Sequence, residues 1–247
     1  MFEQKIVFSA PQEYINQNIA KPQPIKVNIP KWFKELNHTK AVQTIKGCIP
    51  VLDTLTSGYL MRMPQDMIIQ HNVTNKEGKQ DSFVDWGYGP LGQWIAAKGL
   101  NLNFDPSETH HPGQVGKCPY LQKNKELPFY KIMNPWIITT PPGYSCLFVP
   151  PLNNFDDRFH IVAGIVDTDT YTTHINFPIV LNGDKYPTLE TTIKVNTPIA
   201  QIIPFKRDNW KMEIKPSKVD GRWKMLKLTQ RLVHKYKNAF WAKKSWK

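Results

Sequence analysis

The sequence predicts a mainly β fold, a single domain of jelly-roll or β-sandwich type with short helices and a C-terminal amphipathic helix. Strand-like apolar runs recur at roughly ten-residue spacing from 129 to 214, which is typical of sandwiches and jelly rolls. The 21 prolines suit strand ends and loops better than long helices. We expect one β domain over residues 1–221 and a basic helix over residues 222–247.

In the N-terminal part, strands are expected between proline-punctuated connections. Residues 6–10 read as a strand, and Pro30 opens a short helix in the first-turn position where proline is tolerated. Two strand pieces are expected within 48–64. A strand at 67–73 is followed by a turn and by another strand at 82–86.

Residues 101–128 form the least regular part of the sequence, polar and rich in glycine and proline. Such a segment inside a β domain is commonly a binding loop or lid, or is simply mobile. Beyond it, we expect 135–150, 160–181 and 191–205 to be neighbouring strands of one domain. Their apolar and polar side chains alternate, which indicates one buried and one solvated face.

The cysteines and the apolar runs exclude several protein classes. Cys48, Cys118 and Cys146 are far apart and include no CxxC pair, which argues against a disulfide framework and a structural zinc site. Cys146 lies in an apolar run, where a buried, inert thiol is expected. No apolar run approaches the roughly 18 residues of a membrane span, and no secretion signal is recognised. A cytoplasmic location, the host cytoplasm for a phage protein, is the expectation.

The net charge of +12 is concentrated near the C-terminus. From Lys206 onward there are 14 basic and three acidic residues, against 18 and 17 before it. Residues 222–244 have helical periodicity, with an apolar stripe of Met225, Leu228, Leu232, Tyr236 and Phe240. Two interpretations stay open: a helix docked on the β body with solvated lysines, or one that contacts a polyanion or a partner protein. The contacting residues would be Arg222, Lys224, Lys227, Arg231, Lys235, Lys237, Lys243 and Lys244.

The candidate catalytic residues are Asp167, Asp169 and Tyr171, which we expect to alternate onto one face of the strand that begins at Gly164. Two carboxylates two residues apart on a strand lie roughly 7 Å apart, close enough to orient one water or cation. The alternative is that both aspartates cap a turn by accepting hydrogen bonds from backbone amides.

Three histidines are candidate ligand-binding residues: His110 and His111 in the irregular segment, and His174 in a later strand. A metal site of cupin type would show a His-x-His or His-x-Asp pair on one strand, and neither is present. We therefore expect no metal and no cofactor. Phosphate-cradling glycine motifs and the nucleophile elbow GxSxG are absent from the sequence as well.

Two segments resemble motifs of the trimeric dUTPases and related deaminases. Residues 164–171 are similar to that family's Gly-Val-Ile-Asp-x-Asp-Tyr strand, and residues 197–203 to its Gly-x-x-Ile-Ala-Gln-Leu strand. The resemblance implies that Asp167 orients the attacking water and that Tyr171 stacks under the deoxyribose. It also implies a jelly-roll-like fold.

A broader resemblance links most of the chain to an uncharacterised family of T4-like marine phages, notably cyanophages, and some bacteria. The similar segments are 29–33, 48–59, 134–145, 164–171 and 197–207. This resemblance implies an origin in a phage or a marine metagenome. It implies no activity.

Together these observations predict a protein that binds an unidentified small molecule near Asp167, Asp169, Tyr171 and His174, under the 101–128 segment. Three alternatives stay open: a dUTPase-like nucleotide hydrolase, a phage structural component with a basic tail, and a metal-dependent cupin-like oxygenase. A dimer or a trimer would be compatible with the sequence.

Overall fold

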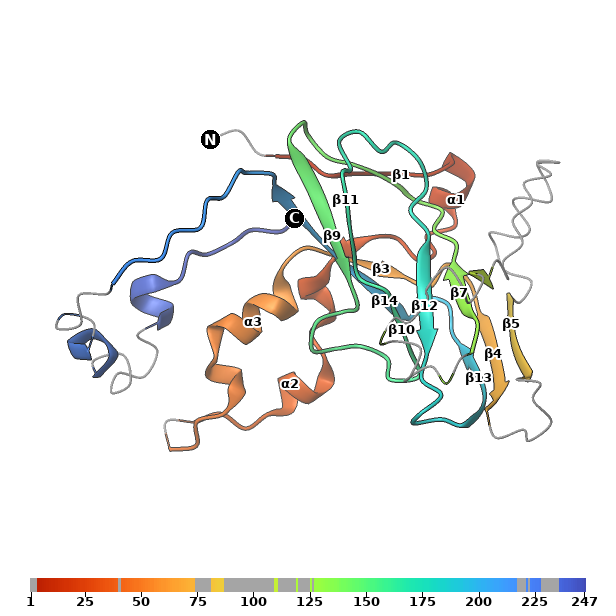
Figure 1. Cartoon of the computed structure of the whole chain (residues 1–247), viewed down its shortest axis with the longest axis horizontal. Coiled ribbons are helices and arrows are strands. Elements are labelled where there is room, and N and C mark those ends of the chain that lie inside the picture. The colour runs from red at the N-terminus through yellow and green to blue at the C-terminus, as the bar shows by residue number, and fades with distance from the viewer. Residues whose placement is uncertain are drawn as a thin grey trace. The chain divides into compact units, whose positions relative to one another are not determined.

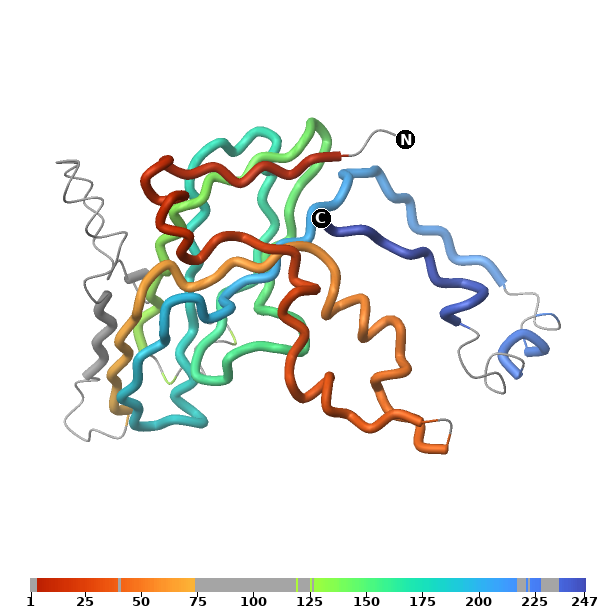
Figure 2. Tube along the Cα trace, turned by 180° about the vertical axis from the view of Figure 1, so that it is seen from behind, coloured from red at the N-terminus to blue at the C-terminus, as the bar shows by residue number. Residues whose placement is uncertain are grey.

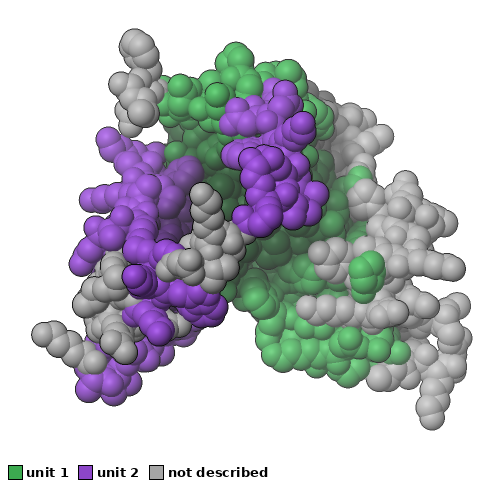
Figure 3. Space-filling model, turned by 60° about the vertical axis from the view of Figure 1, so that its left-hand side comes forward, with its two compact units in different colours: residues 1–23, 58–206 green, residues 24–57, 207–247 purple. Residues whose placement is uncertain are grey.

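The computed structural model describes residues 4–39, 41–73, 81–86, 109–110, 119, 125, 127–216, 221, 223–227 and 236–247, with the backbone alone for 81–86 and 109–110. These residues form two compact units (Figure 3). Unit 1 comprises residues 1–23 and 58–206, and unit 2 comprises residues 24–57 and 207–247. The predicted boundary after residue 221 falls inside unit 2, and that division stays a prediction.

Antiparallel sheets dominate unit 1, which confirms the predicted mainly β class (Figure 1). One sheet has the order β11-β9-β14-β3-β2 (Gly164–Val166, Tyr144–Val149, Pro198–Lys206, Tyr59–Arg62, Gln23–Pro24). A second has the order β10-β12-β7-β6 (Phe159–Ile161, Phe177–Leu181, Phe129–Ile132, Thr109–His110). A third has the order β13-β4-β5 (Thr188–Ile193, Met67–Asn72, Asp81–Trp86), and β1 (Val7–Ser9) pairs with β8 (Ile137–Thr139).

The core of unit 1 joins the sheets of β9 and β12. Phe148 of β9 meets Phe177 of β12 with ring centroids 5.9 Å apart, and both side chains are buried. The N-terminal segment adds α1 (Gln12–Asn16), whose buried Tyr14 packs edge-on against Trp136 (Figure 2 shows this segment in red). Each large apolar side chain buried in this way contributes about 1.5–3 kcal/mol to folding.

The alternation of buried and solvated faces expected for 160–181 and 191–205 is wrong in β12 and β14, because residues 179–181 and 199–202 are buried without interruption, as in strands covered on both faces. Strand β4 does have one buried and one exposed face. Met67 and Ile69 are fully buried, while Ile68 between them is 37% exposed. In β4 the period-2 pattern therefore turns one face to the core, as half-buried strands require. The predicted strands at 67–73 and 82–86 are confirmed as β4 and β5, and 135–150, 160–181 and 191–205 all lie in unit 1.

The first strand piece predicted within 48–64 is wrong, because residues 49–56 form α3 (Ile49–Thr56). Pro50 stands in the first turn, where its missing N–H breaks no helical hydrogen bond, and Ile49 and Leu55 are buried. The helix ends before Gly58, whose φ of +81° brings the chain back into β3. The predicted helix after Pro30 is confirmed as α2 (Lys31–Glu35).

Unit 2 contains α2, α3 and the 3₁₀ turns η1 (Ile25–Asn28) and η2 (Ile45–Gly47). In the predicted C-terminal helix, residues 223–227 are α-helical and Tyr236–Phe240 form a π-helical turn, η3, while 241–247 are not helical. The stripe residues Met225, Tyr236 and Phe240 are 46–48% exposed; Leu228 and Leu232 lie outside the described residues. No helix in the described part of the chain is long and apolar enough to cross a bilayer.

Candidate functional site

The predicted site residues Asp167 and Asp169 lie beside the turn that precedes β9. Strand β11 pairs antiparallel with β9, so that Val166 stands opposite Cys146. The chain leaving β11 therefore runs next to the chain entering β9. Sheet register alone brings the two acidic residues to the turn around Gly143.

The segment after Val166 is a turn rather than a strand. The backbone amides of Thr170 and Tyr171 donate to the Asp167 carbonyl oxygen at 3.1 and 2.9 Å. The alternation expected from Asp167 to Tyr171 therefore does not hold, because strand β11 ends at Val166. Asp167 and Tyr171 are exposed, Tyr171 by 45%.

Both carboxylates are oriented by neighbouring groups, one in the turn before β9 and one in β9 itself. Asp169 Oδ2 accepts the backbone N–H of Gly143 at 2.8 Å, and Asp167 Oδ1 accepts the Ser145 hydroxyl at 2.6 Å. Gly143 has a φ of +83°, a conformation that glycine adopts readily. In the turn-capping alternative an aspartate accepts a hydrogen bond from a backbone amide, and the bond from Gly143 to Asp169 is of this kind.

Thr168 lies buried between the two aspartates and fixes the turn from inside. Its hydroxyl oxygen is 2.7 Å from that of Thr140, and it donates to the Cys146 sulfur at 3.3 Å. Burial raises the pKa of Cys146 to about 11, opposed by the hydrogen bond from Thr168. The raised pKa favours the protonated thiol at neutral pH, and the prediction that Cys146 is buried is confirmed.

Of the three predicted histidines, His174 is the one whose side chain lies among the described residues. His174 Nδ1 is 3.0 Å from the Asn134 carbonyl oxygen, and its backbone forms an isolated bridge with Ile137. His110 pairs through its backbone with Phe129, but its side chain and all of His111 lie outside the described residues. Among the described residues, no three or more metal-ligating side chains lie together. The ligand-binding role of the histidines stays a prediction.

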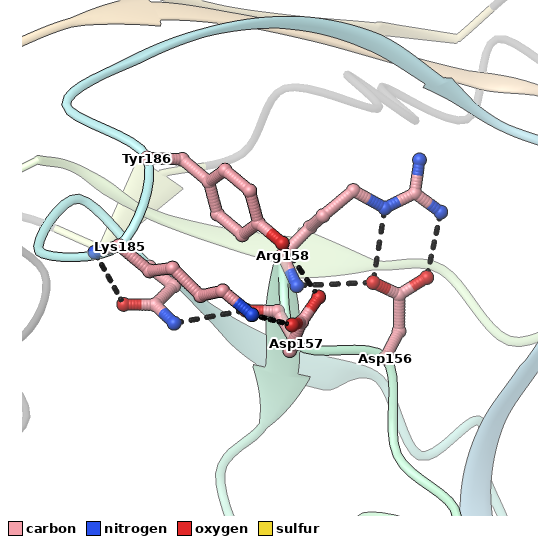
Figure 4. Close-up of polar contacts among 6 residues, drawn as sticks. Asp156, Asp157, Arg158, Lys185 and Tyr186 are labelled. Atoms are coloured by element: carbon pink, nitrogen blue, oxygen red, sulfur yellow. Dashed lines mark hydrogen bonds and ion pairs between the residues drawn. The ribbon is translucent and has the colours of Figure 1, made fainter.

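A second polar cluster, which the sequence reasoning missed, joins the start of β10 to the loop after β12 (Figure 4). Arg158 forms a fork with the Asp156 carboxylate, with bonds of 3.0 Å from Nε and 2.6 Å from Nη2. Asp157 accepts from Tyr186 Oη at 2.8 Å and pairs with Lys185.

The charges of this cluster balance one another. Lys185, and after it Tyr186, lowers the pKa of Asp157, while Asp156 raises the pKa of Arg158. An arginine and a lysine each paired with an acidic neighbour indicate a structural role for the cluster. Its sequence signal is the Asn182-Gly183 pair, which is typical of a tight turn.

The positive charge of the chain belongs to unit 2. Its two segments contain 18 basic and five acidic residues, a net charge of +13, whereas unit 1 contains 14 and 15, a net charge of −1. Of the residues predicted to contact a polyanion, five are described and exposed, namely Lys224, Lys227, Lys237, Lys243 and Lys244. Arg222, Arg231 and Lys235 lie outside the described residues.

The C-terminal segment is attached to α3 within unit 2. Trp241 Nε1 donates to both Asp53 carboxylate oxygens at 3.1 Å, and Lys244 Nζ lies 2.6 Å from Asp53 Oδ2. Lys244 is thus partly neutralised, and Asp53 fixes the last residues of the chain on the helix. No local sequence pattern predicts this contact, because its partners are 188 and 191 residues apart.

Comparison with known proteins yields distant structural matches alone. No protein-family profile and no curated protein sequence matches the chain. A dUTPase from phage phi11 of S. aureus matches 87% of this chain and 98% of its own, at 10% identity and a TM-score of 0.35. The dUTPase of Staphylococcus bacteriophage 80alpha matches 88% of this chain and 90% of its own, at 11% identity and the same TM-score. Scores of this size do not establish a shared fold or a shared activity.

Proposed function

We propose that unit 2 binds a polyanion, and that single-stranded nucleic acid is the polyanion that its surface chemistry fits best. The observation that carries this proposal is the separation of charge, +13 on unit 2 against −1 on unit 1. A surface that dense in positive charge attracts phosphate backbones and releases their counterions. The proposal develops the predicted contact between the basic tail and a polyanion.

Exposed aromatic side chains on the same unit favour a single strand over a duplex. Trp32, Trp223, Tyr236 and Phe240 are 42–60% exposed, and the last three belong to the lysine-rich C-terminal segment. Bases of a single strand stack on aromatic rings, each worth about 1–3 kcal/mol, whereas duplex bases are already stacked. Lysines for the backbone and rings for the bases are the two components of such a site.

The test is fluorescence anisotropy of the full chain with a labelled single strand, a duplex of equal length and heparin. The variant Lys224→Glu/Lys227→Glu should weaken binding of all three, because both side chains are exposed on unit 2. The control Lys5→Glu/Lys21→Glu makes the same change of charge on unit 1 and should bind nearly as the wild type does. Equal losses in the two variants would refute the assignment to unit 2.

The aromatic component needs a separate variant. Trp223→Ala should weaken binding of the single strand by roughly fivefold or more, in line with the loss of one stacked base, and change heparin binding little. A loss of the same size for heparin and the single strand would show that the ring is not a stacking platform.

A second candidate function is binding of a small polar ligand at the turn of Asp167, as predicted from the sequence. The observation that favours it is an exposed carboxylate, oriented by Ser145, on the same turn as the exposed ring of Tyr171. Pro150–Asn154 stand where the dUTPase family has its Arg-Ser-Gly phosphate motif, so ligand binding is proposed here rather than hydrolysis. The oxygenase alternative depends on His110 and His111 and stays a prediction.

This candidate is tested by thermal-shift and NMR titration with nucleotides, sugars and amino acids, alongside a pyrophosphate-release assay with dUTP. A ligand of the Asp167 turn should lose affinity in Asp167→Asn and Tyr171→Ala. Release of pyrophosphate that Asp167→Asn abolishes would instead support the hydrolase alternative. No binding from any of these classes would refute the candidate.

A further inference from the structure

The segment that follows β14 exposes large apolar side chains to an unusual extent. Residues 207–216 belong to no helix or strand, and every one of them is exposed; Figure 1 shows this stretch as an extended trace in blue. Trp210, Met212 and Ile214 are 91%, 84% and 86% exposed. Soluble proteins rarely present such side chains together unless a partner covers them.

The pattern of this segment is that of a β-strand with one apolar face. Trp210, Met212 and Ile214 alternate with Lys211, Glu213 and Lys215. Glu213 Oε2 and Lys215 Nζ lie 2.8 Å apart, which places two charged side chains two residues apart on the same side. The apolar residues therefore share the opposite side. We call residues 208–215 the arm.

The arm is complementary to itself when two copies run antiparallel with Met212 opposite Met212. In that register Lys211 of each copy stands opposite Glu213 of the other, giving two pairs of opposite charge on the polar face. On the apolar face Trp210 stands opposite Ile214. Aromatic–aliphatic and opposite-charge pairs across antiparallel strands are both stabilising. A two-fold axis through Met212 would relate the two copies.

Neighbouring registers and the parallel arrangement are disfavoured by the same charges. A shift that centres the pairing on Lys211 or on Glu213 sets like charges opposite each other at the axis. Parallel, in-register pairing sets each lysine directly opposite the same lysine of the second chain. Like charges directly opposite destabilise a strand pair, so the sequence of the arm selects one register.

Unit 2 offers the surface that such a pairing needs to cover. Among the described residues, 12 of the 18 exposed large apolar side chains belong to unit 2 and six to unit 1. A two-stranded ribbon alone is marginally stable in water, and its apolar face requires packing against other side chains. The concentration of exposed apolar side chains in the unit that includes the arm fits that requirement.

We propose that the arm pairs antiparallel with the arm of a second copy of this chain, in the register centred on Met212, to form a homodimer. This proposal does not depend on nucleic-acid binding by unit 2. The partner is a second copy of this chain rather than a different protein, because antiparallel pairing of two identical arms sets Lys211 of each copy opposite Glu213 of the other.

The test is a charge-exchange experiment read by sedimentation equilibrium of the full chain. Lys211→Glu sets a glutamate opposite Glu213 in both of the symmetry-related pairs, and Glu213→Lys sets a lysine opposite Lys211 in both. Each single variant should raise the dimer dissociation constant by roughly tenfold. An equimolar mixture of the two variants should recover a tight dimer, because every opposed pair is again of opposite charge. Lys215→Glu is the matched control, since its partner in this register is the neutral Asn209.

The register is tested separately by cross-linking with Cys48 and Cys118 replaced by serine. Directly opposite residues of antiparallel strands have Cα atoms about 4.5–5.5 Å apart, within the range of a disulfide. Met212→Cys should therefore oxidise to a covalent dimer, and Lys215→Cys should not. A monomeric wild type, an oligomer that resists both charge reversals, or equal cross-linking at both positions would overturn the proposal.

Discussion

Replacing Gly58 and Gly143 by alanine separates two costs to stability: the backbone strain of a positive φ and the steric clash of the added Cβ. At most positive-φ glycines the two costs occur together. Gly58 and Gly143 have nearly the same backbone conformation, with φ of +81° and +83°. They differ in the space around them. A Cβ on Gly58 would lie 2.1 Å from the Ile202 carbonyl oxygen of β14, whereas a Cβ on Gly143 would meet nothing within 4 Å.

The two magnitudes follow from this difference. Alanine in the left-handed region costs about 1–2 kcal/mol at either position. At Gly58 the clash is with the backbone of Ile202, so β14 must shift, which adds about 1–3 kcal/mol in line with other overpacked sites. Gly58→Ala should therefore lower the free energy of unfolding by about 2–5 kcal/mol, and Gly143→Ala by about 1–2 kcal/mol.

Urea denaturation of the full chain, followed by tryptophan fluorescence and by circular dichroism, measures both values. At roughly 2–4 °C per kcal/mol for a chain of this size, Gly58→Ala should also melt at a clearly lower temperature than Gly143→Ala. Equal losses of stability in the two variants would refute the inferred close approach of β14 to Gly58. A larger loss for Gly143→Ala would contradict the account of both turns.

Thr168→Val keeps the side-chain shape but removes the hydroxyl that bonds Thr140 and Cys146. We expect urea denaturation to show that the free energy of unfolding falls by about 1–2 kcal/mol. A loss under about 0.3 kcal/mol would contradict the buried hydrogen bonds. The folded pKa of Asp157 is lowered, so its pairing stabilises the protein above the ordinary carboxyl pKa and this contribution disappears as pH falls through the lowered value. Lys185→Met should therefore raise the pKa of Asp157 by NMR titration and destabilise at pH 7 more than at pH 3; equal effects would refute the pairing. Removal of residues 222–247 should clearly weaken retention on heparin but lower the melting temperature only slightly, because the described side chains of the apolar stripe are half exposed. Unchanged retention would contradict this.

Local patterns predicted the β class and several of its elements. The short apolar run that predicted β4 and the proline that opens α2 are signals carried by neighbouring residues alone. The same kind of signal misled at residues 49–56, where β-branched residues and Pro50 suit either a strand or a helix start. The burial of Ile49 and Leu55 is what favours the helix, and burial depends on tertiary packing.

The role of Asp167 and Asp169 as site residues stays a prediction, and the sequence left their conformation open between a strand and a turn. The predicted strand from Asp167 to Tyr171 is wrong, because β11 ends at Val166 and the chain turns at Asp167. The groups that orient the two carboxylates, Ser145 and Gly143, are 22 and 26 residues away. Such partners follow from sheet register, which the sequence alone does not specify.

The most direct test of the central claim, that unit 2 binds nucleic acid through its concentrated positive charge, is the salt dependence of affinity for a single strand. For the full chain, log affinity should fall linearly with log salt concentration, with a slope of about −0.7 for each phosphate contacted. Lys224→Glu/Lys227→Glu should flatten that slope by about 0.7 for each lost contact, and Lys5→Glu/Lys21→Glu should leave it unchanged. An affinity independent of salt, or a slope that the two variants change equally, would contradict the account.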